Sequence, residues 1–333
     1  MSEDNQNFNH LKIHTQYSIC EGAIKIEDLK NHCKDNKIKS VGLSDSSNLC
    51  GALEFSEEIS KVGTQPIIGT QINFKFNSDI GMIPIIAKNR NGYENILKLS
   101  SDSYLKYNDN SLPYCDIDNL INNAEGLIVL SGSINCLSGN LFLKNKLNDL
   151  TNIYKLLKHK FKNDFYLEIQ RHGDINEKQF EKFNLNQSYE QKIPIIATHE
   201  VFYLDQSMHE AHDALLCIKN KTYISDKDRI KLSKNHNLKN NDEMFDLFSD
   251  LPEALSNNFY LPYKCNYKAN NSKPLLPEIS SNTEMNSDKM LKTQAAEGLK
   301  QKFNDNLIKI INNQNKKEIY ETYKKRLDHE IKI

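Results

Sequence analysis

The chain has 333 residues, and its 43 Lys and Arg residues nearly balance 44 Asp and Glu residues, which gives a formal net charge of -1. With 38% hydrophobic and 26% charged residues, the composition excludes a disordered polyelectrolyte, and no apolar run approaches the roughly 18 residues that a membrane-spanning helix needs. The balanced charge also argues against a protein whose whole surface binds nucleic acid, since such binding needs an excess of Lys and Arg.

The cysteines and the N-terminus indicate an intracellular protein. The seven Cys residues are odd in number and scattered, without a Cys-x-x-Cys pair, so neither a disulfide framework nor a zinc ribbon is supported. Residues 1–9 are polar and acidic and lack the features of a secretory signal. We therefore predict a cytoplasmic protein with reduced thiols and no membrane partner.

Short apolar runs alternate with helical stretches over the first 200 residues. The runs predict strands at residues 41–43, 66–69, 83–87, 127–131, 165–169 and 193–198, and the stretches predict helices at 26–36, 51–62, 93–105, 150–161 and 177–191. Continuous Val, Ile and Leu runs are typical of parallel strands that are buried on both faces. The repeated strand-then-helix order predicts an α/β barrel or a doubly wound sheet.

The pattern changes after residue 203, where the signal becomes helical and increasingly polar. Helices are predicted within residues 205–220, 241–248 and 281–329, interrupted by a stretch at 261–277 that contains Pro and Asn. Pro and Asn interrupt regular structure, so this stretch is the predicted domain boundary. We expect one domain over residues 1–270 and the beginning of a second over 271–333.

Polar residues follow several predicted strands, at the ends where barrel enzymes carry their chemistry. His10, Lys12 and His14 are expected to share one face of an extended segment, whereas the adjacent His199 and Glu200 point to opposite faces. An ammonium group between two His residues is electrostatically poor for a metal site. His209 and His212 lie three residues apart rather than in His-Glu-x-x-His spacing, which favours helix-surface or capping roles.

Blocks of sequence spread over residues 8–220 resemble the N-terminal polymerase-and-histidinol-phosphatase (PHP) domain of bacterial DNA polymerase III alpha subunits. The segments that carry the likeness include residues 8–18, 43–55, 65–69, 126–132, 165–169, 194–198 and 211–218. The resemblance implies a distorted β/α barrel of the TIM-like, PHP type, followed by a mostly helical start of the polymerase palm.

The resemblance also implies a metal pocket whose ligands have largely been replaced. Metal-binding members carry His and carboxylate ligands at strand ends, and the corresponding positions here define a vestigial pocket of Lys12, His14, Glu21, Asp45, Ser46, Gln71, Glu200 and Phe202. Met82 and Ser133 stand at two further ligand positions. Lys, Ser, Met and Phe remove neutral nitrogen donors and add a positive charge, so a hydrolytic metal centre is not expected. No catalytic, cofactor-binding or metal-binding residue is assigned.

The family's activity gives the expected role of the chain. The alpha subunit performs template-directed DNA synthesis with two Mg²⁺ ions held by palm carboxylates, which lie downstream of Ile333, so the chain is expected to be an N-terminal fragment or a truncated copy. A silent PHP domain then implies a scaffold that docks a proofreading exonuclease subunit, while DNA and the other replicase subunits bind mainly through the missing parts.

Two alternatives and several single-residue roles stay open. The chain could be a metal-dependent PHP phosphoesterase, of the histidinol-phosphatase or proofreading-nuclease kind, or a stand-alone interaction module. Buried Lys is rare without a partner, and the pairing considered for Lys12 is with Asp45 or Glu21. Cys50 and Cys217 are expected to be small buried hydrophobic residues.

Overall fold

The computed structural model describes residues 7–106, 112–274, 287–307 and 316–333. The chain divides into two compact units, Met1–Asn271 and Ser272–Ile333. None of the helices in the described ranges is both long and apolar enough to cross a membrane.

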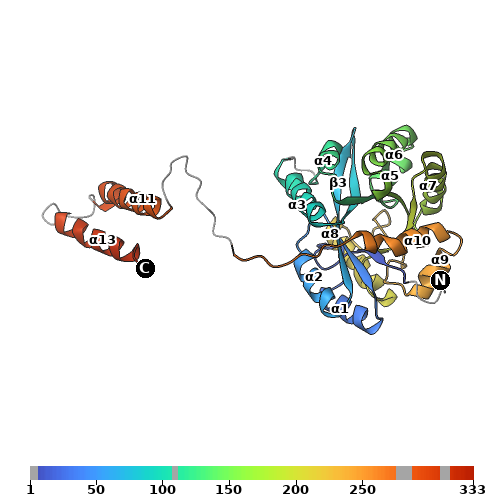
Figure 1. Cartoon of the computed structure of the whole chain (residues 1–333), viewed down its shortest axis with the longest axis horizontal. Coiled ribbons are helices and arrows are strands. Elements are labelled where there is room, and N and C mark those ends of the chain that lie inside the picture. Colours follow the sequence, from blue (N-terminus) through green and yellow to red (C-terminus); the bar gives the residue numbers. More distant parts are fainter. Residues whose placement is uncertain (1–6, 107–111, 275–286, 308–315) are drawn as a thin grey trace. The chain divides into compact units, whose positions relative to one another are not determined.

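The first unit is an α/β barrel (Figure 1). Its strands are β1 (His10–Ile13), β2 (Ser40–Ser46), β3 (Gln65–Phe76), β4 (Asp79–Ala87), β5 (Cys115–Asp116), β6 (Leu127–Leu130), β7 (Phe165–Ile169), β8 (Ile195–Ala197) and β9 (Glu200–Val201). Its helices are α1 (Ile26–Asp35), α2 (Ala52–Lys61), α3 (Arg90–Leu105), α4 (Ile117–Asn122), α5 (Leu137–Leu143), α6 (Leu147–Phe161), α7 (Glu177–Gln191), α8 (His209–Asn220), α9 (Asn241–Leu247) and α10 (Pro252–Tyr260).

The sheet order is β8-β7-β6-β4-β3-β2-β1-β9, with β5 paired to β3. Most neighbours are parallel, but β4 is antiparallel to both β3 and β6. The expectation of a parallel sheet is therefore wrong at β4. Only Asn77 and Ser78 separate β3 from β4, and Asn77 has a φ of 54°. Asn tolerates this left-handed conformation, which lets the chain reverse in a tight hairpin.

The two ends of the sheet meet through the backbone. β8 pairs with β7 and β9 pairs with β1, yet only Thr198 and His199 separate β8 from β9. The fully buried Asn258 of α10 bridges the seam, because its Nδ2 donates to the carbonyls of Asn9 (2.8 Å) and Ala197 (3.0 Å), and its Oδ1 accepts from Asn9 N (2.8 Å). An amide side chain thus replaces strand pairing, and the result is the expected distorted barrel.

Strand β1 contains an irregularity that positions the pocket. His10 pairs with Val41 and Ile13 pairs with Leu43. Between these two pairs β1 therefore has one residue more than β2, as in a β-bulge. Gly42 permits it, because a Cβ at Gly42 would lie 2.6 Å from the Leu11 carbonyl oxygen. His10 therefore does not share a face with Lys12 and His14, which corrects the expectation from strand alternation.

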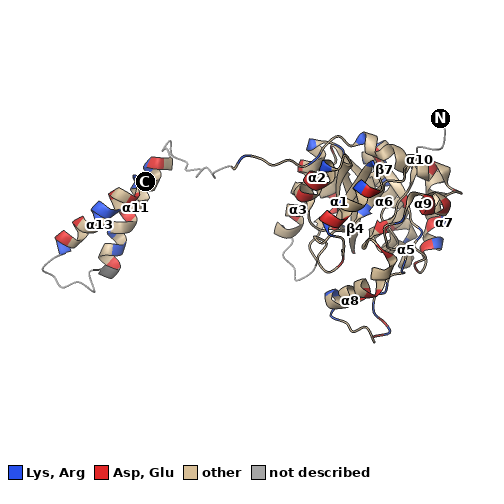
Figure 2. Cartoon of the chain, turned by 90° about the horizontal axis from the view of Figure 1, so that it is seen from below, with Lys and Arg blue, Asp and Glu red and all other residues tan. Residues whose placement is uncertain are grey.

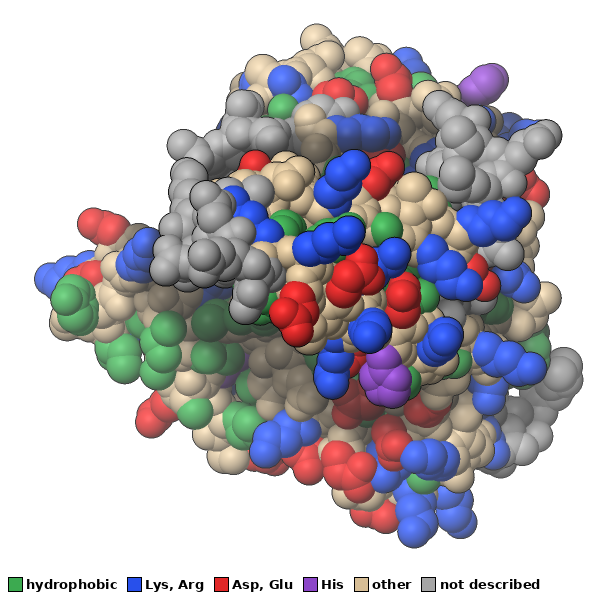
Figure 3. All heavy atoms as spheres, turned by 90° about the vertical axis from the view of Figure 1, so that its left-hand side faces the viewer, with side chains coloured by type: hydrophobic (Ala, Val, Ile, Leu, Met, Phe, Trp, Pro, Cys, Tyr) green, Lys and Arg blue, Asp and Glu red, His purple; other side chains and the backbone are tan. Residues whose placement is uncertain are grey.

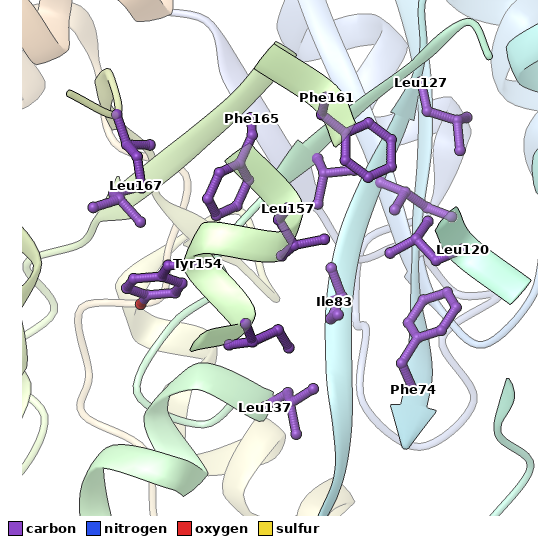
Figure 4. Packing of buried hydrophobic residues seen from close by; sticks show 14 of the residues in the cluster. Phe74, Ile83, Leu120, Leu127, Leu137, Tyr154, Leu157, Phe161, Phe165 and Leu167 are labelled. Atoms are coloured by element: carbon purple, nitrogen blue, oxygen red, sulfur yellow. The ribbon is translucent and has the colours of Figure 1, made fainter. Parts of the chain in front are cut away.

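Apolar side chains fill both sides of the curved sheet. The largest cluster packs β3, β4, β6 and β7 against α3, α5 and α6, with Phe74, Tyr154, Leu157 and Phe165 buried (Figure 4). A second cluster packs β1 and β2 against α1 and α2. A third fills the inside of the barrel with one residue or more from most strands, and Leu261 and Cys265 join it. The stretch predicted as a boundary at 261–277 therefore begins inside the first unit, while residues 275–277 lie outside the described ranges.

The second unit consists of α11 (Ser287–Lys302), a π-helical turn at Phe303–Leu307 and α13 (Lys316–Glu330). Residues 281–286 and 308–315 of the predicted helical region lie outside the described residues. Among the described hydrophobic side chains of this unit only Phe303 is buried, and its ring lies 5.1 Å from that of Tyr320. Such a helix pair has very little core of its own.

Candidate functional site

Lys12 lies on β1 and is completely buried. Its Nζ lies 3.3 Å from Glu168 Oε1 and 3.4 Å from Glu200 Oε1. Neither contact has hydrogen-bond geometry, and Lys12 Nζ and Glu168 Oε2 have no hydrogen-bond partner within the described part of the chain. The expected pairing of Lys12 with Asp45 or Glu21 is therefore wrong, because β7 and β9 supply its two carboxylates.

His14 and Gln71 complete the surroundings of Glu200. His14 Nε2 lies 2.9 Å from Glu200 Oε1, and Gln71 Nε2 donates to the same oxygen at 2.6 Å. His14 Nδ1 donates to Ser18 Oγ at 3.2 Å, since the Ser18 hydroxyl itself donates to Asp45 at 2.7 Å. One carboxylate oxygen of Glu200 therefore accepts a hydrogen bond from the Gln71 amide and also lies against the Lys12 ammonium and the His14 ring.

The charges of this pocket stabilise one another. Burial raises the pKa of Glu200, but the Lys12 ammonium and His14 outweigh burial and hold that pKa well below its usual value. Burial likewise lowers the pKa of Lys12, but Glu168 and Glu200 raise it above the ordinary lysine value. Lys12 and Glu200 are therefore both charged at neutral pH and form a buried ion pair. Hydrogen bonds donated to Glu200 help to stabilise this pair.

Asp45 stabilises the turn after β1. Its carboxylate accepts from Thr15 N (2.7 Å), Thr15 Oγ1 (2.8 Å) and Ser18 Oγ (2.7 Å). Burial raises the pKa of Asp45, although the hydroxyl donors lower it in part. Ser46 contributes its backbone N–H to Ser18 Oγ at 3.1 Å. These two residues tie β2 to the loop after β1 and lie next to His14 without contacting Lys12.

Glu21 and Phe202 are the least suited to metal binding among the vestigial set. Glu21 forms an ion pair with Lys219 of α8, and its carbonyl accepts from His212 Nε2 at 2.7 Å. The Phe202 ring stacks on His14 with a centroid separation of 4.4 Å. At the two further positions, Met82 is half-buried and the buried Ser133 Oγ lies near Cys136 Sγ (3.5 Å). Phe202 offers no lone pair, and Glu21 is engaged elsewhere.

A cluster of histidines lies on the other side of the Glu200 backbone. The His172 ring stacks on His236 at 3.9 Å and on His199 at 4.5 Å. His172 accepts from Glu200 N at 3.1 Å, while His236 Nδ1 donates to the Glu200 carbonyl at 3.0 Å. His199 and Glu200 thus point to opposite faces, as predicted.

His172, Asp174 and His236 offer ligand atoms within 4.8 Å of one another, which is close enough for a metal ion. Several of their ring nitrogens already form hydrogen bonds, however. His172 Nε2 accepts from a backbone N–H, so Nδ1 carries the proton and donates to Glu177 (3.0 Å). His236 Nδ1 donates to a carbonyl, and Nε2 lies 3.1 Å from Asp174 Oδ2. Metal binding through either nitrogen of His172 would break one of these hydrogen bonds.

Sequence reasoning missed Glu168, His172 and His236. Glu168 could have been noticed, because a lone acid inside the apolar strand 165–169 needs a buried cation, and Lys12 is a Lys within a strand. His172 and His236 carry no comparable sequence signal, since they lie on loops that only the fold brings together. Two smaller expectations are also wrong: His212 is buried rather than on the helix surface, and Cys50 is exposed. Cys217 is buried, as expected.

The sequence of the chain is similar to those of known proteins. Residues 10–172 match the PHP domain family. The chain is 35% identical over 332 residues to the DNA polymerase III subunit alpha of Rickettsia felis, which covers 98% of this chain and 27% of the relative. It is 32% identical over 341 residues to the subunit of Caulobacter vibrioides, covering 99% of this chain and 29% of that protein.

Among solved structures, a two-domain protein from Bacteroides vulgatus that contains a predicted PHP-like metal-dependent phosphoesterase aligns with a TM-score of 0.41 at 10% identity. The alignment covers 73% of this chain and 63% of that protein. The chain spans little more than a quarter of the length of its curated relatives. It contains a PHP domain and is related, over nearly its whole length, to the N-terminal region of DNA polymerase III alpha subunits.

Proposed function

We propose that this chain is the N-terminal part of a DNA polymerase III alpha subunit and that its PHP domain is metal-free and catalytically silent. The complete subunit would carry out template-directed DNA synthesis in the cytoplasm with Mg²⁺ held by palm residues beyond Ile333. The PHP domain would act as a scaffold and as the docking site of a proofreading exonuclease subunit. The observation that carries the proposal is the buried Lys12 ammonium between Glu168 and Glu200.

The residues of the pocket do not fit a divalent metal centre. A metal ion near Glu200 Oε1 would lie beside the Lys12 ammonium, which is 3.4 Å from that oxygen, and the two cations would repel each other in a medium of low dielectric constant. Gln71 supplies a neutral amide, which binds a divalent metal ion more weakly than a carboxylate does. Phe202 has no atom that could act as a metal ligand. Lys12 therefore provides the positive charge that the two buried glutamates require.

The second unit fits the proposed beginning of a palm domain. Its helices α11 and α13 expose Leu291 and Tyr323, and only Phe303 is buried among its described hydrophobic residues. A helix pair with so little core needs a further surface to pack against. The coding sequence after codon 333 tests this assignment: an open frame with an Asp-x-Asp palm motif supports it, and a stop codon without such a motif favours a stand-alone module.

An exposed apolar surface supports the docking role. A cavity of about 620 Å³ lies between the loop after β1, the loop after β2 and α3, and it is lined by Ile19, Cys50, Leu97 and Tyr104 among others. Ile19 is 79% exposed and Tyr104 52%. Figure 3 shows hydrophobic side chains gathered at the left of the picture. Exposed apolar patches of this kind mark protein interfaces.

Charge does not single out a nucleic-acid face on the barrel. Figure 2 shows Lys and Arg interspersed with Asp and Glu along the labelled helices of the first unit. Several of these charges pair with each other, including Lys30 with Glu27 and Glu58. This distribution supports the proposal that DNA binds mainly through other parts of the complete subunit.

A metal-dependent PHP phosphoesterase is the competing function. It would need His14 as a free ligand and a carboxylate set open to the metal, whereas His14 contacts Glu200, Ser18 and Gln71. The His172, Asp174 and His236 group is the best remaining candidate for a metal site, and its hydrogen bonds argue against that use.

Metal analysis and a phosphoesterase assay on the full 333-residue chain distinguish the two functions. After incubation with Zn²⁺ or Mn²⁺ and desalting, we expect less than stoichiometric metal and no hydrolysis of a phosphate diester above a heat-denatured control. Stoichiometric metal with hydrolysis that His14→Asn abolishes would overturn the proposal. His159→Asn is the matched control, because His159 is exposed on α6.

Docking is tested by binding of the purified exonuclease subunit from the same organism. We expect Ile19→Asp and Leu97→Asp to weaken binding at least tenfold, since each places a charge in the apolar cavity. Ile175→Asp is the matched control, because Ile175 is 86% exposed and does not line that cavity. Unchanged binding in both cavity variants, or an equal loss in the control, would exclude this surface.

A further inference from the structure

Two open cavities lie at the end of the barrel where strands β1, β2, β3, β7 and β8 begin. The first, of about 740 Å³, lies between α6, α7 and α10, and Tyr189 and Tyr260 are among its lining residues. The second, of about 420 Å³, is lined by Tyr263 and by the first residues of β2 and β3, Ser40 and Gln65. Among the described residues, none of the vestigial pocket lines either cavity. The proposed polymerase and docking roles leave this end of the barrel unused.

Three tyrosine side chains at these cavities are exposed to solvent. Tyr189 is 88% exposed, Tyr263 76% and Tyr260 52%. The rings of Tyr260 and Tyr263 are neighbours, with centroids 6.3 Å apart. A large aromatic ring gains free energy when a flat partner covers it and removes apolar area from water. The three rings therefore form an aromatic surface on which a planar group can stack.

The turn that carries two of these rings is fixed to the barrel. It follows α10, and its residues Leu261 and Pro262 are buried. Gln65 Nε2 donates to the carbonyls of Pro262 (3.1 Å) and Cys265 (2.7 Å), which ties the turn to the start of β3. Side chains on a fixed turn are already arranged for binding, so less conformational entropy is lost when a partner stacks on them.

The charged residues that line the two cavities are mostly positive. Four lysines and one glutamate give a net charge of +3, and they are Lys39, Lys158, Lys192, Lys264 and Glu253. Lys264 forms an ion pair with Asp164. The other three lysines form no ion pair with any residue in the described part of the chain. The surface therefore attracts anions and offers aromatic rings beside the positive charges.

We propose that this surface binds single-stranded nucleic acid. Bases stack on the three tyrosines, and backbone phosphates pair with the three lysines that have no carboxylate partner, as in other proteins that hold single strands without reading their sequence. Charge alone does not distinguish this surface from the rest of the barrel, but the exposed tyrosines among the lysines do. A duplex is a poorer ligand because its bases are already stacked, and an acidic peptide offers negative charge without flat rings. The proposal depends neither on the docking role nor on the absence of metal.

Fluorescence anisotropy of a labelled oligothymidylate of about 16 nucleotides tests the proposal on the full chain at low ionic strength. We expect saturable binding. An abasic strand of the same length keeps the phosphates and loses the bases, so it should bind at least about tenfold more weakly, and a duplex should also bind more weakly. An oligouridylate of the same length shows whether the strand can be RNA. Saturable binding of either strand supports the proposal, and the tighter one identifies the ligand.

Variants separate stacking from charge. Tyr263→Ala should raise the Kd at least about fivefold, whereas Tyr263→Phe should not, because a phenyl ring still stacks. Tyr223→Ala is the matched control, since Tyr223 is also 76% exposed and lines neither cavity. Lys192→Gln should raise the Kd and reduce the slope of log Kd against log salt concentration by about 0.7. Lys182→Gln, at an exposed position of α7 outside the cavity, should change neither.

Several results would overturn the proposal: no saturable binding, equal binding of the abasic strand or the duplex, or equal effects of Tyr263→Ala and Tyr223→Ala. If polyglutamate displaces the labelled strand as well as unlabelled oligothymidylate does, the surface binds an acidic protein instead. Circular dichroism of each variant confirms that the native fold is retained. None of these results bears on the metal analysis, so failure here is distinguishable from failure of the proposed function.

Discussion

The side chain and the backbone of Glu200 show two different ways in which one barrel buries polar groups. Its side chain lies among charges, where the Lys12 ammonium and Glu168 are completely or almost completely buried. Its backbone N–H and carbonyl are bound by His172 and His236, whose rings stack 3.9 Å apart. The first side is stabilised by opposite charges in a low dielectric medium, and the second by fixed imidazole tautomers that satisfy backbone groups.

This comparison separates what a metal-binding barrel would need from what this chain has. A metal ion would compensate the carboxylates of Glu168 and Glu200, and here Lys12 of β1 provides the positive charge. On the other side the histidines are present, but their nitrogens are engaged by Glu200, Glu177 and Asp174. The histidine content of a PHP barrel is therefore a weak guide to metal binding unless the second hydrogen-bond partner of each ring is known.

The charged side should be the more sensitive one. Replacing Lys12 with Met leaves Glu168 and Glu200 buried without their cation, and we expect the free energy of unfolding to fall by about 3–5 kcal/mol. Urea denaturation followed by circular dichroism measures the loss. Lys155→Met, at an exposed position on α6, should change stability by less than about 0.5 kcal/mol.

A second replacement tests the electrostatic origin of that loss. The double variant Lys12→Met, Glu200→Gln removes one of the stranded charges, so it should be more stable than Lys12→Met alone. If the double variant is equally or less stable, then lost packing of the lysine stem, rather than uncompensated charge, accounts for the effect.

Much of the fold could be predicted from the sequence, because apolar periodicity is local. Helix α7 spans the predicted residues 177–191, and the strand at 165–169 has the predicted bounds. The reversal at Asn77 was missed, and so was α10, whose buried Asn258 closes the barrel seam. Both depend on contacts between segments that are distant in the sequence.

The pocket was less predictable than the barrel. Strand alternation predicts His10, Lys12 and His14 on one face, but the β1 irregularity, which Gly42 accommodates, turns His10 away from that face. The partners of Lys12 come from strands more than 150 residues away, so no local pattern identifies them. Whether the vestigial set binds metal stays a prediction, which the metal analysis tests.

The histidines should make stability depend on pH in a known direction. Burial lowers the pKa of His10 to about 4 from the ordinary 6.5, so between these values the unfolded chain binds a proton that the folded chain does not. Stability is therefore unaffected by His10 above about pH 6.5 and falls as the pH drops toward 4, by up to about 3 kcal/mol.

Comparison with a variant isolates this contribution from other groups. His212, whose pKa burial also lowers to about 4, acts in the same direction, whereas the raised pKa of Asp45 acts in the opposite one. We therefore compare the free energy of unfolding of the wild-type chain with that of His10→Phe from pH 7 to 4.5. The contributions of His212 and Asp45 are present in both proteins and cancel in the difference. A difference that does not change with pH would contradict the assignment of a neutral, buried His10.

The hydrogen-bonded side of Glu200 should give the smallest effect. His236→Phe keeps a ring to stack on His172 but loses the hydrogen bond to the Glu200 carbonyl and the contact of Nε2 with Asp174, so we expect the free energy of unfolding to fall by about 1–2 kcal/mol. In a double-mutant cycle with Asp174→Asn, the two changes should be less than additive, because they remove the same contact. Zinc should not raise the melting temperature of the wild-type chain, since metal binding would first have to break these bonds. A zinc-dependent rise that His236→Phe abolishes would show instead that the histidine cluster is a metal site. The side chain of Glu200 would then face the Lys12 ammonium, and its backbone would face a bound metal ion.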